Sequence, residues 1–167
     1  MPAVFFDVNV YVDAIVYWNT GNDPDEITFD DGSGWKGPPA ALLAIAIRDH
    51  ALIRGETIVL FSSDHVFTQV AAVLEKKYLW RPEAVDLALD WMYNLVEGSG
   101  GEVIKEGSTT PNLQPDDPED NRVLGDALAT RAALLVTSDQ KFRDLGPYAG
   151  VPFLTPPEFL GRMRQRT

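Results

Sequence analysis

The stretch DPEDNRVLGDALATRAALLVTSD, residues 117–139, holds a helix and a strand in succession and decides the fold class. Asp117 followed by Pro118 is typical of a helix start, because aspartate caps free N–H groups and proline fits the first turn. The apolar stripe of this helix consists of Val123, Leu124, Ala127 and Leu128. Leu134–Thr137 is a short apolar run suited to a buried strand, and Asp139 follows it closely.

The rest of the chain continues this alternation of strands and helices. Short apolar runs bounded by turn residues predict strands, and apolar residues at helical spacing predict helices. The expected strands are Ala3–Phe6, Thr57–Phe61, Glu102–Ile104, Leu134–Thr137 and Val151–Leu154. The expected helices are Asn9–Trp18, Ala40–Arg54 closed by Gly55, one capped within Ser62–Asp64, one from Pro82, one from Asp117, and Pro157–Arg164. This order predicts an α/β fold, a three-layer α/β/α sandwich with a central parallel sheet, in a single domain spanning residues 1–167.

Composition restricts the class of protein. The 167 residues are 45% hydrophobic and 23% charged, which favours a globular fold over a disordered chain. No apolar run is long enough to predict a membrane-spanning helix, and the start MPAVFFDVNVYVD lacks the basic region of a signal peptide. Cysteine is absent, which agrees with a reducing compartment. We therefore expect a cytoplasmic protein without membrane association.

The net charge of −11 argues against a protein that holds nucleic acid mainly by its phosphates, because such proteins usually carry a basic surface. Two explanations reconcile an acidic chain with a nucleic acid substrate. Part of the negative charge can belong to a metal site, where a cation neutralises clustered carboxylates. A basic partner protein can also supply the missing positive surface.

Acidic side chains stand at corresponding places in the expected fold. Asp7 and Asp139 each follow a predicted strand, and Asp120 lies in the first turn of a predicted helix. The carboxyl ends of parallel strands meet at one edge of a sheet, where ligands usually bind. Asp120 shares a helix side with Val123 and Ala127, so it should face the sheet. Three such carboxylates suit Mg²⁺ or Mn²⁺, which can activate water for attack on a phosphodiester.

Three segments together resemble the PIN-domain family, most closely the bacterial toxins of toxin–antitoxin pairs (VapC-like). VFFDVNVYVDAI at residues 4–15 resembles the family's opening strand, which ends in an aspartate followed two residues later by a polar residue. Residues 117–146 resemble its second half, where an aspartate opens a helix and Thr-x-Asp ends the following strand. PFLTPPEFL at residues 152–160 resembles its usual close.

The resemblance implies a Mg²⁺- or Mn²⁺-dependent ribonuclease. It implies that Asp7, Asp120 and Asp139 are the catalytic, metal-binding acids and that Asn9 and Thr137 support them. Family members of the toxin type often form homodimers and are silenced by a small antitoxin protein. Those partners, together with an RNA substrate, are therefore expected here.

One departure from the family pattern leaves alternatives open. The family usually carries a further acid on the helix after the second strand, and Gln69 stands there as a supporting residue. A neutral amide contributes less charge to a metal site, so a non-catalytic PIN-like module that binds RNA or protein is the alternative. Each acid also has a structural interpretation, such as Asp139 capping a helix at Gln140–Leu145. A flap-type DNA nuclease is a third hypothesis, which the chain length disfavours.

Overall fold

The computed structural model describes residues 2–21, 27, 29, 34–53, 55–107, 111–113 and 117–164. The strands are β1 Ala3–Phe6, β2 Leu52–Ile53, β3 Glu56–Thr57, β4 Val59–Ser63, β5 Val103–Ile104, β6 Leu134–Val136 and β7 Phe153–Leu154. The helices are α1 Val8–Asn19, α2 Pro39–Arg48, α3 Asp64–Lys76, α4 Pro82–Gly98, α5 Pro118–Ala129, α6 Gln140–Asp144 and α7 Pro156–Arg164. None of these helices is long and apolar enough to cross a membrane.

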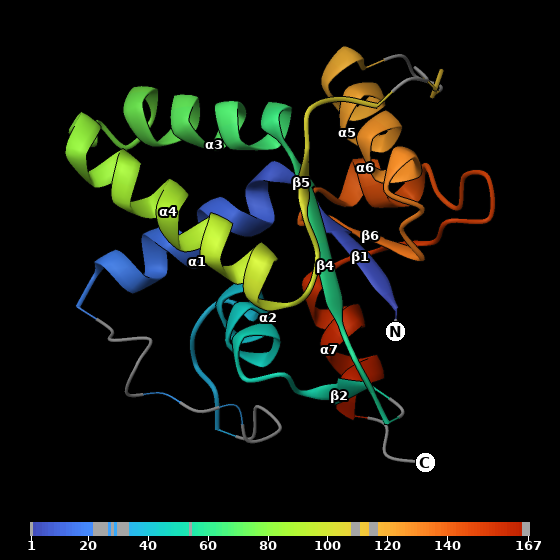
Figure 1. Cartoon of the computed structure of the whole chain (residues 1–167), viewed down its shortest axis with the longest axis horizontal. Coiled ribbons are helices and arrows are strands. Elements are labelled where there is room, and N and C mark those ends of the chain that lie inside the picture. The colour runs from blue at the N-terminus through green and yellow to red at the C-terminus, as the bar shows by residue number, and fades with distance from the viewer. Residues whose placement is uncertain are drawn as a thin grey trace.

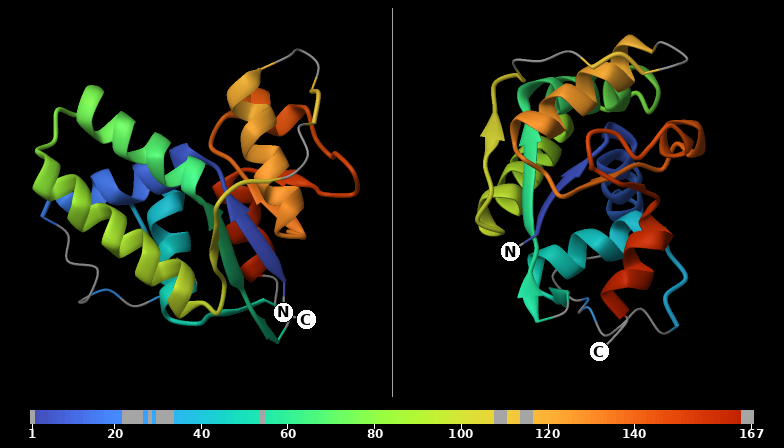
Figure 2. Two further views of the ribbon diagram at one scale, coloured as in Figure 1. Left: turned by 45° about the horizontal axis from the view of Figure 1, so that its top comes forward. Right: turned by 90° about the vertical axis from the view of Figure 1, so that its right-hand side faces the viewer.

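The central sheet has five strands in the order β5-β4-β1-β6-β7, and every pairing in it is parallel (Figure 1). Chain connections run from β1 outward through β4 to β5, and then back across to β6 and β7. Because crossovers between parallel strands are right-handed, this reversal places the connecting helices α5 and α6 on the opposite face. Figures 1 and 2 show α5 and α6 on the other side of the strands from α1, α3 and α4. The predicted three-layer α/β/α fold is confirmed.

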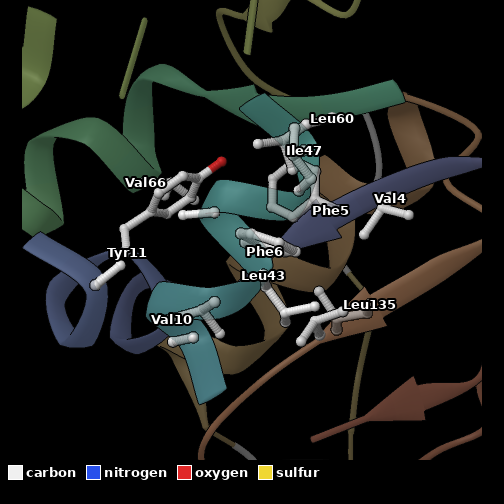
Figure 3. Close-up of a cluster of buried hydrophobic side chains, with 14 of the residues drawn as sticks. Val4, Phe5, Phe6, Val10, Tyr11, Leu43, Ile47, Leu60, Val66 and Leu135 are labelled. Atoms are coloured by element: carbon white, nitrogen blue, oxygen red, sulfur yellow. The ribbon is translucent and has the colours of Figure 1, made fainter. Parts of the chain in front are cut away.

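The main core lies between the sheet and the helices α1, α2 and α3. Figure 3 shows Phe5 and Phe6 of β1 next to Leu43 and Ile47 of α2, with Tyr11 of α1 nearby. All five side chains are at most 2% exposed, which is typical of strands covered on both faces. Close packing therefore fixes the position of the central strand β1. The backbone of Asp7, which follows β1, is fixed in the same way.

The prediction of a helix over Ala40–Arg54 is wrong at its end. The helix α2 ends at Arg48, and His50 adopts a positive φ of 54° that interrupts helical geometry. The chain then forms an antiparallel hairpin in which Leu52 pairs with Thr57. Gly55, with φ of 82°, belongs to the turn of this hairpin and is not a helix cap. Helical spacing of apolar residues continues through this segment, so the pattern alone did not reveal the break.

Smaller differences concern strand limits. Thr57 belongs to the hairpin, and the strand of the central sheet, β4, begins at Val59 and runs to Ser63. The predicted last strand at Val151–Leu154 is shorter, because only Phe153–Leu154 pairs with β6. These shifts leave the topology unchanged.

Candidate active site

Asp7 follows β1 and is fixed at the carboxyl edge of the sheet. Its N–H donates to the carbonyl oxygen of Val136 at 2.8 Å, which continues the pairing with β6. Its Oδ1 accepts from the N–H of Val8 at 2.8 Å and caps α1. Its Oδ2 accepts from the hydroxyl of Thr137 at 2.8 Å. The side chain is 7% exposed, so Asp7 is a buried carboxylate held in one orientation.

Two neighbouring residues tie the ends of β1 and β6 together. The Thr137 hydroxyl that donates to Asp7 also accepts from the N–H of Asp139 at 3.1 Å. The side-chain oxygen of Asn9 accepts from the N–H of Ser138 at 3.0 Å. Asn9 and Thr137 therefore lie beside Asp7 and Asp139 and connect segments about 130 residues apart. This is the position that the family resemblance implies for supporting residues.

Asp139 performs the capping role that the sequence left open. Its Oδ1 accepts from the N–H of Lys141 at 3.0 Å and more weakly from that of Phe142 at 3.5 Å, at the start of α6. The residue is exposed, and the hydrogen bonds found to its side chain among the described residues use Oδ1 and not Oδ2. Capping and ligand binding are compatible, because a carboxylate has two oxygens.

Asp120 lies in the first turn of α5, and Asp117 caps that helix. The Oδ1 of Asp117 accepts from the N–H groups of Glu119 and Asp120 at 3.0 and 3.1 Å. Asp120 is partly buried, whereas Asp117 and Glu119 are exposed. Figure 1 shows α5 beginning at the same end of the strands as α3, which is the carboxyl end of β4.

The acids at this edge perturb one another electrostatically. Burial raises the pKa of Asp7 to about 6, and the charges of Asp139 and Asp117 add to the rise against the lowering effect of its two hydrogen bonds. Burial also raises the pKa of Asp120 to about 7, with further increases from Asp117, Asp7, Asp139 and Glu119 in that order. Asp117 therefore acts on Asp120 as well as capping α5, and its place three residues before Asp120 is the sequence signal of this proximity.

The donor set consists of carboxylate oxygens, which is the chemistry that Mg²⁺ and Mn²⁺ prefer. Burial raises the pKa values of Asp7 and Asp120 most, and a divalent cation would offset both the cost of burying the charge and the added repulsion between the acids. Within the ranges that the structure describes, no three His, Cys, Asp or Glu side chains are already arranged closely enough to hold one metal ion. The acids lie at the same edge of the sheet and repel one another. Their binding to one shared cation stays a prediction.

The comparisons with family models and curated proteins found no match, so the geometry of the site is the main evidence on function. No family model matches the chain, and no curated protein matches it. Membership of the PIN-domain family therefore stays a prediction from the quoted motifs.

Gln69 lies on α3, which starts at the same edge. The side chain of Ser63 caps this helix, and His65 in its first turn contacts α5 through Glu119, with Nε2 and Oε2 3.0 Å apart. Gln69 is half-buried and follows His65 by four residues, so the two share one side of the helix. The pairing of His65 with Glu119 arises between separate helices and has no local signature.

Proposed function

We propose that this chain is a Mg²⁺- or Mn²⁺-dependent endoribonuclease with a PIN-like domain. The observation that carries the proposal is the pair of acids Asp7 and Asp120. They come from distant parts of the chain, reach one edge of a parallel sheet, and have pKa values raised to about 6 and about 7. Such perturbed carboxylates are typical of functional sites, because burial and like charges disfavour their ionised forms.

Asp7, Asp120 and Asp139 would hold the cation, with Gln69 contributing at most a neutral amide oxygen. A bound divalent cation lowers the pKa of water and offsets negative charge on a phosphodiester. The protein's own part is to fix the ligands. Thr137 and the Val8 N–H hold both oxygens of Asp7, and Asn9 holds the backbone at Ser138.

The net charge of −11 supports a role for a basic partner. We propose that the chain acts in the cytoplasm as the toxin of a toxin–antitoxin pair, as a homodimer, and that a basic antitoxin protein covers the acidic edge. RNA would then reach the edge only after the partner leaves.

The test is cleavage of labelled RNA by the purified chain with Mn²⁺. Wild-type protein should cut RNA, and a chelator should abolish the activity. Asp7→Asn and Asp139→Asn should each lower the cleavage rate by at least about 10²-fold, since each removes charge from the site. Asp90→Asn changes an exposed acid on α4 and serves as the matched control, with activity retained. Wild-type protein that leaves every tested RNA intact would contradict the proposal.

The second candidate is a non-catalytic PIN-like module that binds RNA or protein, and Gln69 is the observation that favours it. Calorimetric titration with Mg²⁺ and Mn²⁺ separates the two. A ribonuclease of the proposed type should bind the metal at millimolar concentration, whereas the module should not. Gln69→Glu should strengthen metal binding about tenfold, which corresponds to about 1.4 kcal/mol. No gain would show that position 69 lies outside the site.

A further inference from the structure

A cleft of about 330 Å³ adjoins the acidic edge and has no role in the site described so far. Asp13 of α1 lines it, together with Ser138 and Gln140, which flank Asp139 on either side. The starts of α2 and α7, Pro38–Ala40 and Thr155–Pro157, form the remaining walls. Its volume falls in the range of pockets that bind small ligands, roughly 300–1,000 Å³. A ligand in this cleft would therefore lie directly beside Asp139.

Much of the lining is apolar, because two pairs of prolines contribute to it. Pro38 and Pro39 come from the start of α2, and Pro156 and Pro157 from the start of α7. Proline lacks an N–H group, so these helix starts offer few backbone donors to an anion. No Lys or Arg side chain is among the described residues that line the cleft. The lining therefore suits a planar, uncharged ring better than a phosphate.

Asp13 is the charged group among the described residues that line the cleft, and Ser138 of the acidic edge lines it as well. Burial raises the pKa of Asp13, and the nearby Ser138 hydroxyl acts against this rise. The N–H of Ser138 in turn donates to Asn9 at 3.0 Å. Ser138 thus links the ends of β1 and β6 and lines the same cleft as Asp13, which is exposed.

We propose that this cleft binds a guanine base of the RNA substrate, with Asp13 accepting from the N1–H and N2–H groups of guanine. This inference rests on the proposed ribonuclease function. The Watson–Crick edge of guanine carries two adjacent donors, which match the two oxygens of a carboxylate. The corresponding edges of adenine, cytosine and uracil place an acceptor next to a donor, and that acceptor would face the negative charge. Guanine is therefore the base that fits Asp13.

Cleavage of a randomised RNA pool tests the base preference. Wild-type protein should cut next to guanine at least about tenfold more often than next to any other base. Asp13→Asn replaces one acceptor by a donor and should reduce this preference about tenfold. Ser138→Ala, which removes the hydroxyl near Asp13, should reduce it by a smaller factor. Asp90→Asn removes the same charge from exposed α4 and should leave the preference unchanged. Cleavage without preference for guanine would overturn the inference.

Binding without cleavage separates this inference from the proposed function. Guanosine 5′-monophosphate should shift the amide NMR signals of Ser138 and Gln140 in the full chain, and Asp13→Asn should abolish the shifts. The adenosine, cytidine and uridine monophosphates should produce smaller shifts. Guanine binding by a chain that cuts no RNA would contradict only the ribonuclease. Equal shifts from all four nucleotides, or shifts from an arginine-rich peptide alone, would overturn the guanine site.

Discussion

Helix α5 carries two aspartates in opposite surroundings, Asp120 in its first turn and Asp126 in its middle. Asp126 is completely buried, and its Oδ1 accepts from the N–H of Gly107 at 2.6 Å and lies 3.6 Å from Nε of Arg122. Asp120 is partly exposed and is surrounded by other acids, which raise its pKa to about 7 together with burial. Asp126 has a hydrogen-bond donor at Oδ1 and a cation nearby, although its Oδ2 is buried without a hydrogen-bond partner among the described residues. An acid among acids is instead protonated more readily, or has its charge offset by a bound cation.

The region around Asp126 connects the segment after β5 to the middle of α5. A Cβ atom at Gly107 would lie 2.5 Å from the carbonyl oxygen of Gly125, so only glycine allows this close approach of the loop to α5. One turn earlier, Asn121 accepts from the N–H of Leu113 at 2.8 Å. The middle of α5 therefore fixes the connection from β5, whereas the first turn of α5 carries acids at the edge of the sheet.

The largest effect is expected from Asp126→Ala. The change leaves the buried N–H of Gly107 without its acceptor and Arg122 without its buried partner, so the free energy of unfolding should fall by about 2–4 kcal/mol. Urea unfolding followed by circular dichroism measures the loss. Asp120→Ala is the control on the same helix and should not destabilise the protein. Equal losses from the two variants would show that the two acids do not differ as described.

A gain in stability is expected from Asp120→Asn. The folded-state pKa of Asp120, about 7, lies above its ordinary value of 3.8, so folding favours the protonated form. Wild type and variant should therefore be equally stable near pH 3. The wild type should fall behind as the pH rises from about 4 to 7, because the carboxyl ionises there in the unfolded chain but stays protonated in the folded one, and the difference should be constant above pH 7. The gain should be about 1 kcal/mol above pH 7.5, after allowance for solvent screening of a partly exposed group. Urea titrations at both pH values provide the test, and a loss of stability at pH 7.5 would contradict it.

The smallest effect is expected from the addition of Mn²⁺ to the folded chain. At a Mn²⁺ concentration of roughly three times the Kd, the fold should gain about 0.8 kcal/mol, which corresponds to a Tm increase of roughly 2–3 °C. Asp126→Ala should keep this increase, because its defect lies away from the acidic edge. Asp120→Asn should lose most of it. Differential scanning calorimetry compares the variants. An undiminished Tm increase with Mn²⁺ in Asp120→Asn would show that Asp120 does not bind the metal.

Local sequence patterns were sufficient for most of the fold. Asp117 with Pro118 predicted the start of α5, and the apolar runs predicted β1 and β6, because capping and burial act over a few residues. The failure at Leu52–Thr57 has the same origin. Two short segments pair across a turn there, and pairing between segments leaves no periodic signal in either of them.

The residue types at the site could be predicted from the sequence, but their pKa values and contacts could not. A carboxylate after a strand can be recognised in the printed sequence, as Asp7 and Asp139 were. Its pKa depends on burial and on charges brought close by folding, and Asp117 acts on Asp7 across about 110 positions. The contacts of Asp13 with Ser138 and of His65 with Glu119 arise in the same way. Electrostatic energy depends on distance in space, so only the folded arrangement of the strands and helices could establish it.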